Sequence, residues 1–121
     1  MRTEYMFIRR KDFDPRLKEG SQRDYGMNPV GILLFSGDAN GVCVTLAMAH
    51  PKDGFDKRKG LARCKGLLNS AKTVAVEPKD LENHIQLMLF QRKNRIPYSS
   101  RIENFTKVFI RKVTDPLPPK V

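Results

Sequence analysis

The chain has 121 residues, 40% of them apolar and 8% aromatic, which suits one domain with one modest core. It carries 23 Lys and Arg against 13 Asp and Glu, and the resulting net charge of +10 attracts polyanions. No apolar run is long enough to span a membrane, the charged N-terminus is unlike a secretory signal, and two cysteines cannot build a disulfide scaffold. We therefore expect one cytoplasmic domain, residues 1–121.

Three strands are predicted in the first half of the chain. Residues 3–10 alternate as a strand does, and residues 11–29, which are rich in charge, Gly and Pro, predict a mobile loop. Residues 30–49 predict a hairpin around a segment dense in turn-forming residues. Neither face of its second strand, residues 42–49, is charged, and one face carries only small side chains. We expect a helix to pack closely on that face.

A basic helix follows the hairpin. Residues 55–70 have an apolar stripe at Leu61, Cys64 and Leu68, and Asp53 is a candidate N-cap. The basic side chains of this segment fall outside the stripe. Cys43 and Cys64 are expected to be small residues buried under the helix.

The second half of the chain predicts a strand, a helix and a final strand. A short strand is expected at residues 72–76, a helix from Pro78 to about Asn94, and a strand at residues 105–113 before a Pro-rich tail, 114–121. This order predicts an α+β fold: a small, mostly antiparallel sheet of four to five strands with two helices packed on one face.

The positive charge is concentrated in two windows. Residues 52–72 hold seven basic and two acidic side chains, and residues 91–112 hold seven basic and one acidic. Lys and Arg also keep small proteins soluble, but solubility does not require clusters of one sign. If the two windows are neighbours in the fold, they make one electropositive surface that grips an anionic partner.

Nucleic acid is the partner that this pattern favours. No helix-turn-helix, zinc-finger or RNP motif is present, so we expect contacts with the phosphate backbone rather than base reading. Tyr98 lies in a polar loop between basic residues, where it is expected to be exposed and to stack on a base. The candidate anion-binding residues are Lys52, Lys57, Arg58, Lys59, Arg63, Lys65, Arg92, Lys93, Arg95, Tyr98 and Arg101.

Metal, cofactor and catalytic chemistry find little support. The cysteines and histidines occur singly, with no CxxC or HxxxH pair, and no glycine-rich nucleotide loop is present. No motif supplies several catalytic roles at once. The sequence therefore predicts no metal and no cofactor, and binding is favoured over catalysis.

Two non-enzymatic alternatives remain open. The basic face could dock on an acidic host protein and inhibit it, or the chain could sequester a phosphorylated nucleotide ligand. A membrane partner is disfavoured because neither predicted helix joins a broad apolar face to a uniformly basic one. The sequence is compatible with a homo-oligomer and does not determine the oligomeric state.

Residues 50–68, HPKDGFDKRKGLARCKGLL, resemble a stretch in small bacteriophage-encoded proteins of unknown function. In those proteins a strand is followed by a Pro-Lys-Asp-x-Phe element, a basic cluster, Gly and a short helix. Here Lys65 and Gly66 follow Cys64 where the family pattern ends in Gly-Arg. The resemblance implies a phage protein that acts in the bacterial cytoplasm, where such proteins often block host defence or metabolism. It brings no established activity and no accepted catalytic residues.

Overall fold

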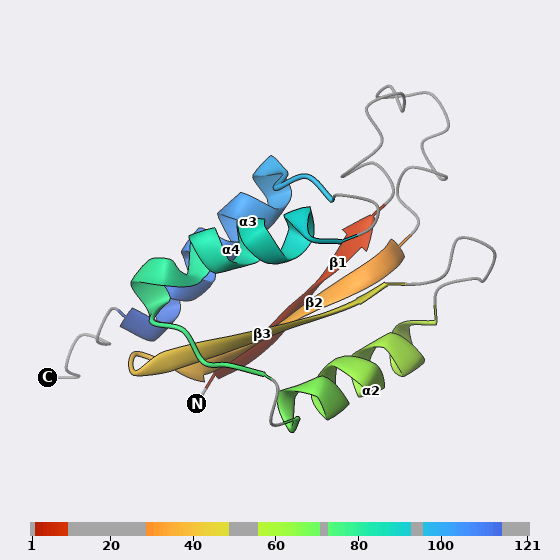
Figure 1. The fold of residues 1–121 in the computed structure, drawn as a ribbon, viewed down its shortest axis with the longest axis horizontal. Coiled ribbons are helices and arrows are strands. Elements are labelled where there is room, and N and C mark those ends of the chain that lie inside the picture. Colours follow the sequence, from red (N-terminus) through yellow and green to blue (C-terminus); the bar gives the residue numbers. More distant parts are fainter. Residues whose placement is uncertain (1, 10–28, 49–55, 71–72, 93–95, 115–121) are drawn as a thin grey trace, which may run out of the picture.

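A three-stranded antiparallel sheet forms the centre of the molecule (Figure 1). The computed structural model describes residues 2–9, 29–48, 56–70, 73–92 and 96–114. Strands β1 (Arg2–Arg9), β2 (Pro29–Asp38) and β3 (Gly41–Met48) follow the order β1-β2-β3, so β2 is central. All residues of β2 from Gly31 to Gly37 are buried, which means that both faces of the sheet need a cover.

The predicted hairpin is confirmed by the pairing of β2 with β3. Leu33 lies opposite Leu46, and the strands continue to the pair Asp38 and Gly41, so the turn is tighter than the sequence suggested. The Asp38 side chain accepts a hydrogen bond from Asn40 N–H at 2.9 Å, the local contact by which Asp favours turns.

Helix α2 (Lys57–Leu68) covers one face of the sheet, over β2 and β3. It packs on the small side chains of β3, as expected. The Thr45 hydroxyl donates to the carbonyl of Cys64 at 3.1 Å, and Cys64 is fully buried beside Ile32 and Leu34. The helix is capped by Asp56, whose carboxylate accepts from Lys59 N–H at 3.1 Å.

Helices α3 (Leu81–Phe90) and α4 (Ser100–Thr114) cover the opposite face. A 3₁₀ turn, Pro78–Asp80, leads into α3. The predicted helix is confirmed in the form of this turn and α3, and Leu81, Ile85 and Leu89 are fully buried in the larger of the two cores.

The prediction of a final strand at residues 105–113 is wrong, since this segment lies within α4. Its buried residues, Ile102, Thr106 and Phe109, recur every three or four positions, which is the period of a helix. The helix begins after Ser99, whose hydroxyl accepts from Ile102 N–H at 3.3 Å. If residues 105–113 formed a strand, cationic and aromatic side chains would alternate along a single face of it.

In place of the strand expected at residues 72–76, the structure has a single β-bridge. In this bridge Val42 and Val76 exchange backbone hydrogen bonds of 2.8 and 2.9 Å. The fold is therefore α+β with three strands and three helices in the described ranges, rather than four to five strands and two helices. The helices also lie on both faces, not on one. The expected mobile loop, 11–29, and the Pro-rich tail, 114–121, lie outside the described residues except at their ends, where Pro29 begins β2 and Thr114 ends α4. Asp53, the expected N-cap, also lies outside the described residues, and Asp56 caps the helix instead.

None of the helices in the described part of the chain combines the length and the apolar run needed to cross a membrane.

Phe35 is the residue through which β2 holds α4. Its ring lies 5.1 Å from the Phe105 centroid and 5.3 Å from the Phe109 centroid, and it is fully buried. We expect Phe35→Ala to lower the free energy of unfolding by about 3–5 kcal/mol, because it leaves a cavity between sheet and helix. Urea unfolding followed by circular dichroism measures this. A loss below about 1 kcal/mol would mean that α4 does not pack here.

Candidate functional site

The two basic windows do not form one surface. Helix α2, from the first window, and helix α4, from the second, lie on opposite faces of the sheet (Figure 1). The expectation of a shared electropositive side is therefore wrong for the helical parts of the two windows. Each set of cations has to be judged on its own surroundings.

Two arginines of the second window bind the edges of the sheet. Arg101 donates from Nη2 to the main-chain carbonyl of Phe7 on edge strand β1 at 2.6 Å. Arg92 donates from Nη2 to the carbonyl of Leu46 on the other edge strand, β3, at 3.2 Å. An edge strand presents unpaired backbone groups, and a guanidinium that satisfies one of them stabilises the fold and blocks further pairing. Both residues were predicted to bind anions, and the structure gives both a structural contact.

Other members of the second window are also engaged. Lys107 pairs with Glu103 one turn earlier at 2.6 Å, which raises the pKa of Lys107, and Lys112 pairs with Glu4 of β1 at 3.0 Å. Lys93 and Arg95, like Lys52 of the first window, lie outside the described residues.

Tyr98 is not the exposed stacking residue that the sequence suggested. Its hydroxyl donates to Glu82 Oε1 at 2.9 Å, and its ring packs against the larger core. Burial, followed by the hydrogen bond to Glu82, raises the pKa of Tyr98 well above its usual range. The residue links the start of α4 to α3, so it is a structural contact rather than a base platform.

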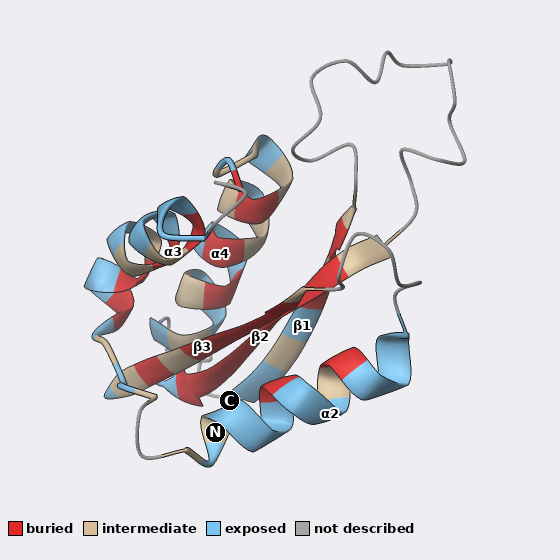
Figure 2. Ribbon diagram, turned by 45° about the vertical axis from the view of Figure 1, so that its right-hand side comes forward, coloured by how far each residue is buried: buried red, intermediate tan, exposed pale blue. Residues whose placement is uncertain are grey.

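The cations of α2 have the opposite character, since all five are exposed (Figure 2). None of them forms an ion pair with a carboxylate in the described part of the chain. The helix itself contains no Asp or Glu between its first and last residue. The five residues are Lys57, Arg58, Lys59, Arg63 and Lys65.

Four of the five cations flank an outer face made of small residues. Ala62 and Gly66 are exposed one turn apart on this face, and a Cβ at Gly66 would meet no atom within 4 Å. By helical periodicity, Arg58 and Lys65 lie on one flank, while Lys59 and Arg63 lie on the other. A ligand that approaches α2 from solvent would meet positive charge on both sides.

The charge pattern of α2 opposes the stability of the isolated helix. Its first turn holds three cations and no acid, although the helix dipole favours anions there. Lys59 and Arg63 repel one another at an (i, i+4) spacing, and Gly66 costs about 1 kcal/mol relative to Ala. Asp56 offsets part of this, and the backbone N–H of Lys59 lowers the pKa of its carboxyl. An anion bound to this surface would relieve the repulsion.

Phe7, which was not predicted as a site residue, lies beside α2, and Tyr5 of the same strand contacts Phe7. The Nζ atom of Lys57 is 4.9 Å from the centre of the Phe7 ring, and the Tyr5 and Phe7 rings meet edge to face at 5.6 Å. Their alternation in β1 was visible in the sequence. The proximity of Phe7 to α2 was not, because it depends on how the helix crosses the sheet.

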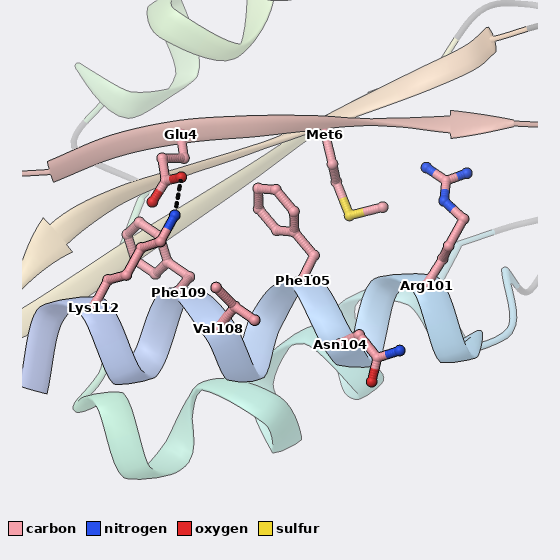
Figure 3. Close-up of a pocket in the computed structure, with 8 residues that line it drawn as sticks. All are labelled: Glu4, Met6, Arg101, Asn104, Phe105, Val108, Phe109 and Lys112. Atoms are coloured by element: carbon pink, nitrogen blue, oxygen red, sulfur yellow. Dashed lines mark hydrogen bonds and ion pairs between the residues drawn. The ribbon is translucent and has the colours of Figure 1, made fainter.

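A groove of 370 Å³ lies on the other face, between β1 and α4 (Figure 3). Its middle is apolar, with Met6, Phe105 and Val108, and its ends carry Arg101 and the Lys112–Glu4 pair. Because both cations already have partners, this groove adds no free positive charge to the candidate site.

Cys64 is a buried structural residue. Burial raises the pKa of the Cys64 thiol, and its sulfur lies 3.7 Å from the carbonyl oxygen of Ile32. A buried thiol held in this way is a poor nucleophile. Within the described ranges, no three His, Cys, Asp or Glu side chains gather as a metal site would require.

Comparison with known proteins adds no relative: no protein-family model, curated protein or solved structure matches this chain. The geometry of α2 is therefore the basis for assigning a function.

The contribution of Arg101 to stability, through its contact with the edge of the sheet, can be measured without any anion. We expect Arg101→Ala to lower the free energy of unfolding by about 1–3 kcal/mol, because the Phe7 carbonyl loses a charged donor. Arg58→Ala, on exposed α2, should leave stability within about 0.5 kcal/mol. Thermal or urea unfolding compares the two variants. Equal stability losses would show that Arg101 has no special structural role.

The raised pKa of Tyr98 predicts a loss of stability at alkaline pH. Tyrosine in the unfolded chain ionises near its usual pKa of 10.0, whereas folded Tyr98 stays protonated to higher pH. The contribution of Tyr98 is thus complete below pH 10 and declines above it. Tyr98→Phe should be less stable at neutral pH by about 1 kcal/mol, and this difference should narrow as the pH rises above 10. Urea unfolding at pH 8 to 11 measures it; a constant difference contradicts the prediction.

Proposed function

We propose that this chain is a small, basic nucleic-acid-binding protein whose helix α2 contacts the phosphate backbone. One observation carries the proposal: the five exposed cations of α2 have no carboxylate partners among the described residues. A phage origin and action in the bacterial cytoplasm, which the resemblance of residues 50–68 implies, form part of the same proposal.

Binding of a polyanion explains the charge pattern of α2 better than a role in solubility does. Solubility is served by mixed charges spread over a surface, whereas α2 concentrates one sign against its own dipole. Sites that break local stability rules are often functional. A row of phosphates supplies the negative charge that this helix lacks.

The mode of contact follows from the side chains available. Lys and Arg neutralise phosphates and release counterions, and this free energy does not depend on base sequence. Five phosphate contacts predict a slope of log affinity against log salt of about −3.5 on single strands and about −4.5 on duplex DNA. Weak sequence preference and a steep salt dependence are the expected signature.

Charge reversal on α2 tests the proposal. We expect Arg58→Glu with Arg63→Glu to weaken binding of a fluorescent oligonucleotide at least ~10-fold and to reduce the salt slope by about 2. The matched control is Lys79→Glu with Arg111→Glu, two exposed positions outside α2 with the same change in net charge. Fluorescence anisotropy from low to moderate salt measures both variants. If both double variants lost the same affinity, binding would depend on net charge and not on the position of the cations in α2.

A second measurement separates nucleic acid from the two alternative partners. The protein is purified from cells with and without nuclease treatment, and the co-purifying material is identified. Nuclease-sensitive RNA or DNA supports the proposal. A stoichiometric acidic host protein, or a small nucleotide that raises the melting temperature, would replace it with inhibition or with sequestration.

A further inference from the structure

Helix α2 leaves part of its own face of the sheet uncovered. It packs mainly on β2 and β3, while the N-terminal part of β1 on the same face, at Thr3 and Tyr5, remains exposed. Thr3 and Tyr5 on this face are exposed, whereas Met6 and Ile8, which point to the other face, are buried under the larger core. A strip of β1 therefore lies exposed next to the basic helix (Figure 2).

The strip presents an aromatic ring. Tyr5 is 48% exposed, and its ring meets Phe7 edge to face at 5.6 Å. Phe7 in turn lies under the ammonium group of Lys57 at 4.9 Å and packs against the smaller core, so it is fixed in place. Through Phe7, the strand and the first turn of α2 are joined at one end of the strip.

One flank of α2 carries two cations on the same side of the helix as Leu61. Leu61 and Phe7 both pack against the smaller core, which places Leu61 on the inner side of the helix. Arg58 and Lys65 lie three residues before and four residues after Leu61, so they share its side of the helix. Both are exposed and neither forms an ion pair with a described carboxylate. Positive charge and an open aromatic ring therefore occupy the same face.

We propose that this face binds single-stranded nucleic acid, with a base stacked on Tyr5 and the neighbouring phosphates paired with Arg58 and Lys65. This inference rests on the proposed function and specifies its substrate class. An aromatic ring can stack only on a base whose face is free, as in a single strand, because duplex bases are stacked on each other. Charge alone would not distinguish the two forms, whereas charge beside an open ring favours the single strand.

The test compares single-stranded and duplex probes against variants of Tyr5. Fluorescence anisotropy is measured with a 15-nucleotide oligo(dT), a 15-nucleotide oligo(rU) and a 15-base-pair duplex. Tyr5→Leu keeps an apolar side chain but removes the ring, and we expect single-strand affinity to fall about 10-fold, close to 1.4 kcal/mol. Tyr5→Phe keeps the ring and should bind within about twofold of the parent. Duplex affinity should be lower than single-strand affinity and unchanged in both variants.

The matched control is Phe90→Leu, which removes a more exposed ring, 62% exposed, from α3 on the opposite face. It should leave affinity for every probe unchanged. An oligo(dT) with abasic positions adds a test of stacking. The parent should bind it more weakly than intact oligo(dT), whereas Tyr5→Leu should bind the two oligonucleotides with similar affinity. Circular dichroism confirms that each variant is folded. The ratio of oligo(dT) to oligo(rU) affinity indicates whether DNA or RNA is preferred.

The outcomes distinguish the two proposals. Duplex binding as tight as single-strand binding, or an unchanged Tyr5→Leu, would overturn the single-strand inference. In that case a loss of oligonucleotide affinity on charge reversal in α2 would still support nucleic-acid binding. If the parent binds none of the three probes at low salt, both proposals fail.

Discussion

A three-stranded sheet with apolar side chains on both faces is the constraint on which the rest of this fold depends. Every residue of β2 from Gly31 to Gly37 is buried, so water has to be excluded above and below. Helix α2 covers one face, and α3 with α4 covers the other. Such a small sheet also has two edge strands for one central strand, which makes its edges as important as its faces.

The roles of the cations follow from that arrangement. Arg101 and Arg92 lie where edge carbonyls need donors, and Lys112 joins α4 to β1 through Glu4. These contacts draw positive charge from the second window into the structure. The cations of α2, on a helix anchored by Cys64 and Leu61, remain exposed and form no ion pair with a described carboxylate. Net charge alone could not separate these two groups, because they differ only in their neighbours.

Much of the fold could be predicted from sequence, and the errors have physical causes. The β2–β3 hairpin, the small-residue face of β3 and the apolar stripe of α2 depend on local patterns, and each was correct. Helix α4 was missed because residues 105–113 contain enough β-branched and aromatic residues to satisfy a strand pattern. The spacing of Ile102, Thr106 and Phe109 favoured a helix. The site was harder to predict, since the partners of Tyr98 and Arg101 are distant in sequence.

The cover of β1 by α4 has a consequence for biosynthesis. Lys112 contacts Glu4 across 108 positions of the chain, and Met6 and Ile8 are buried in a core that includes Ile102 and Phe109. Until the ribosome has added α4, only α3 can cover that face of the sheet, and the apolar side chains that α4 buries remain exposed. Contacts of such long range also slow folding. The nascent polypeptide is thus most prone to aggregate before α4 leaves the exit tunnel, and a chaperone would be most useful at that stage.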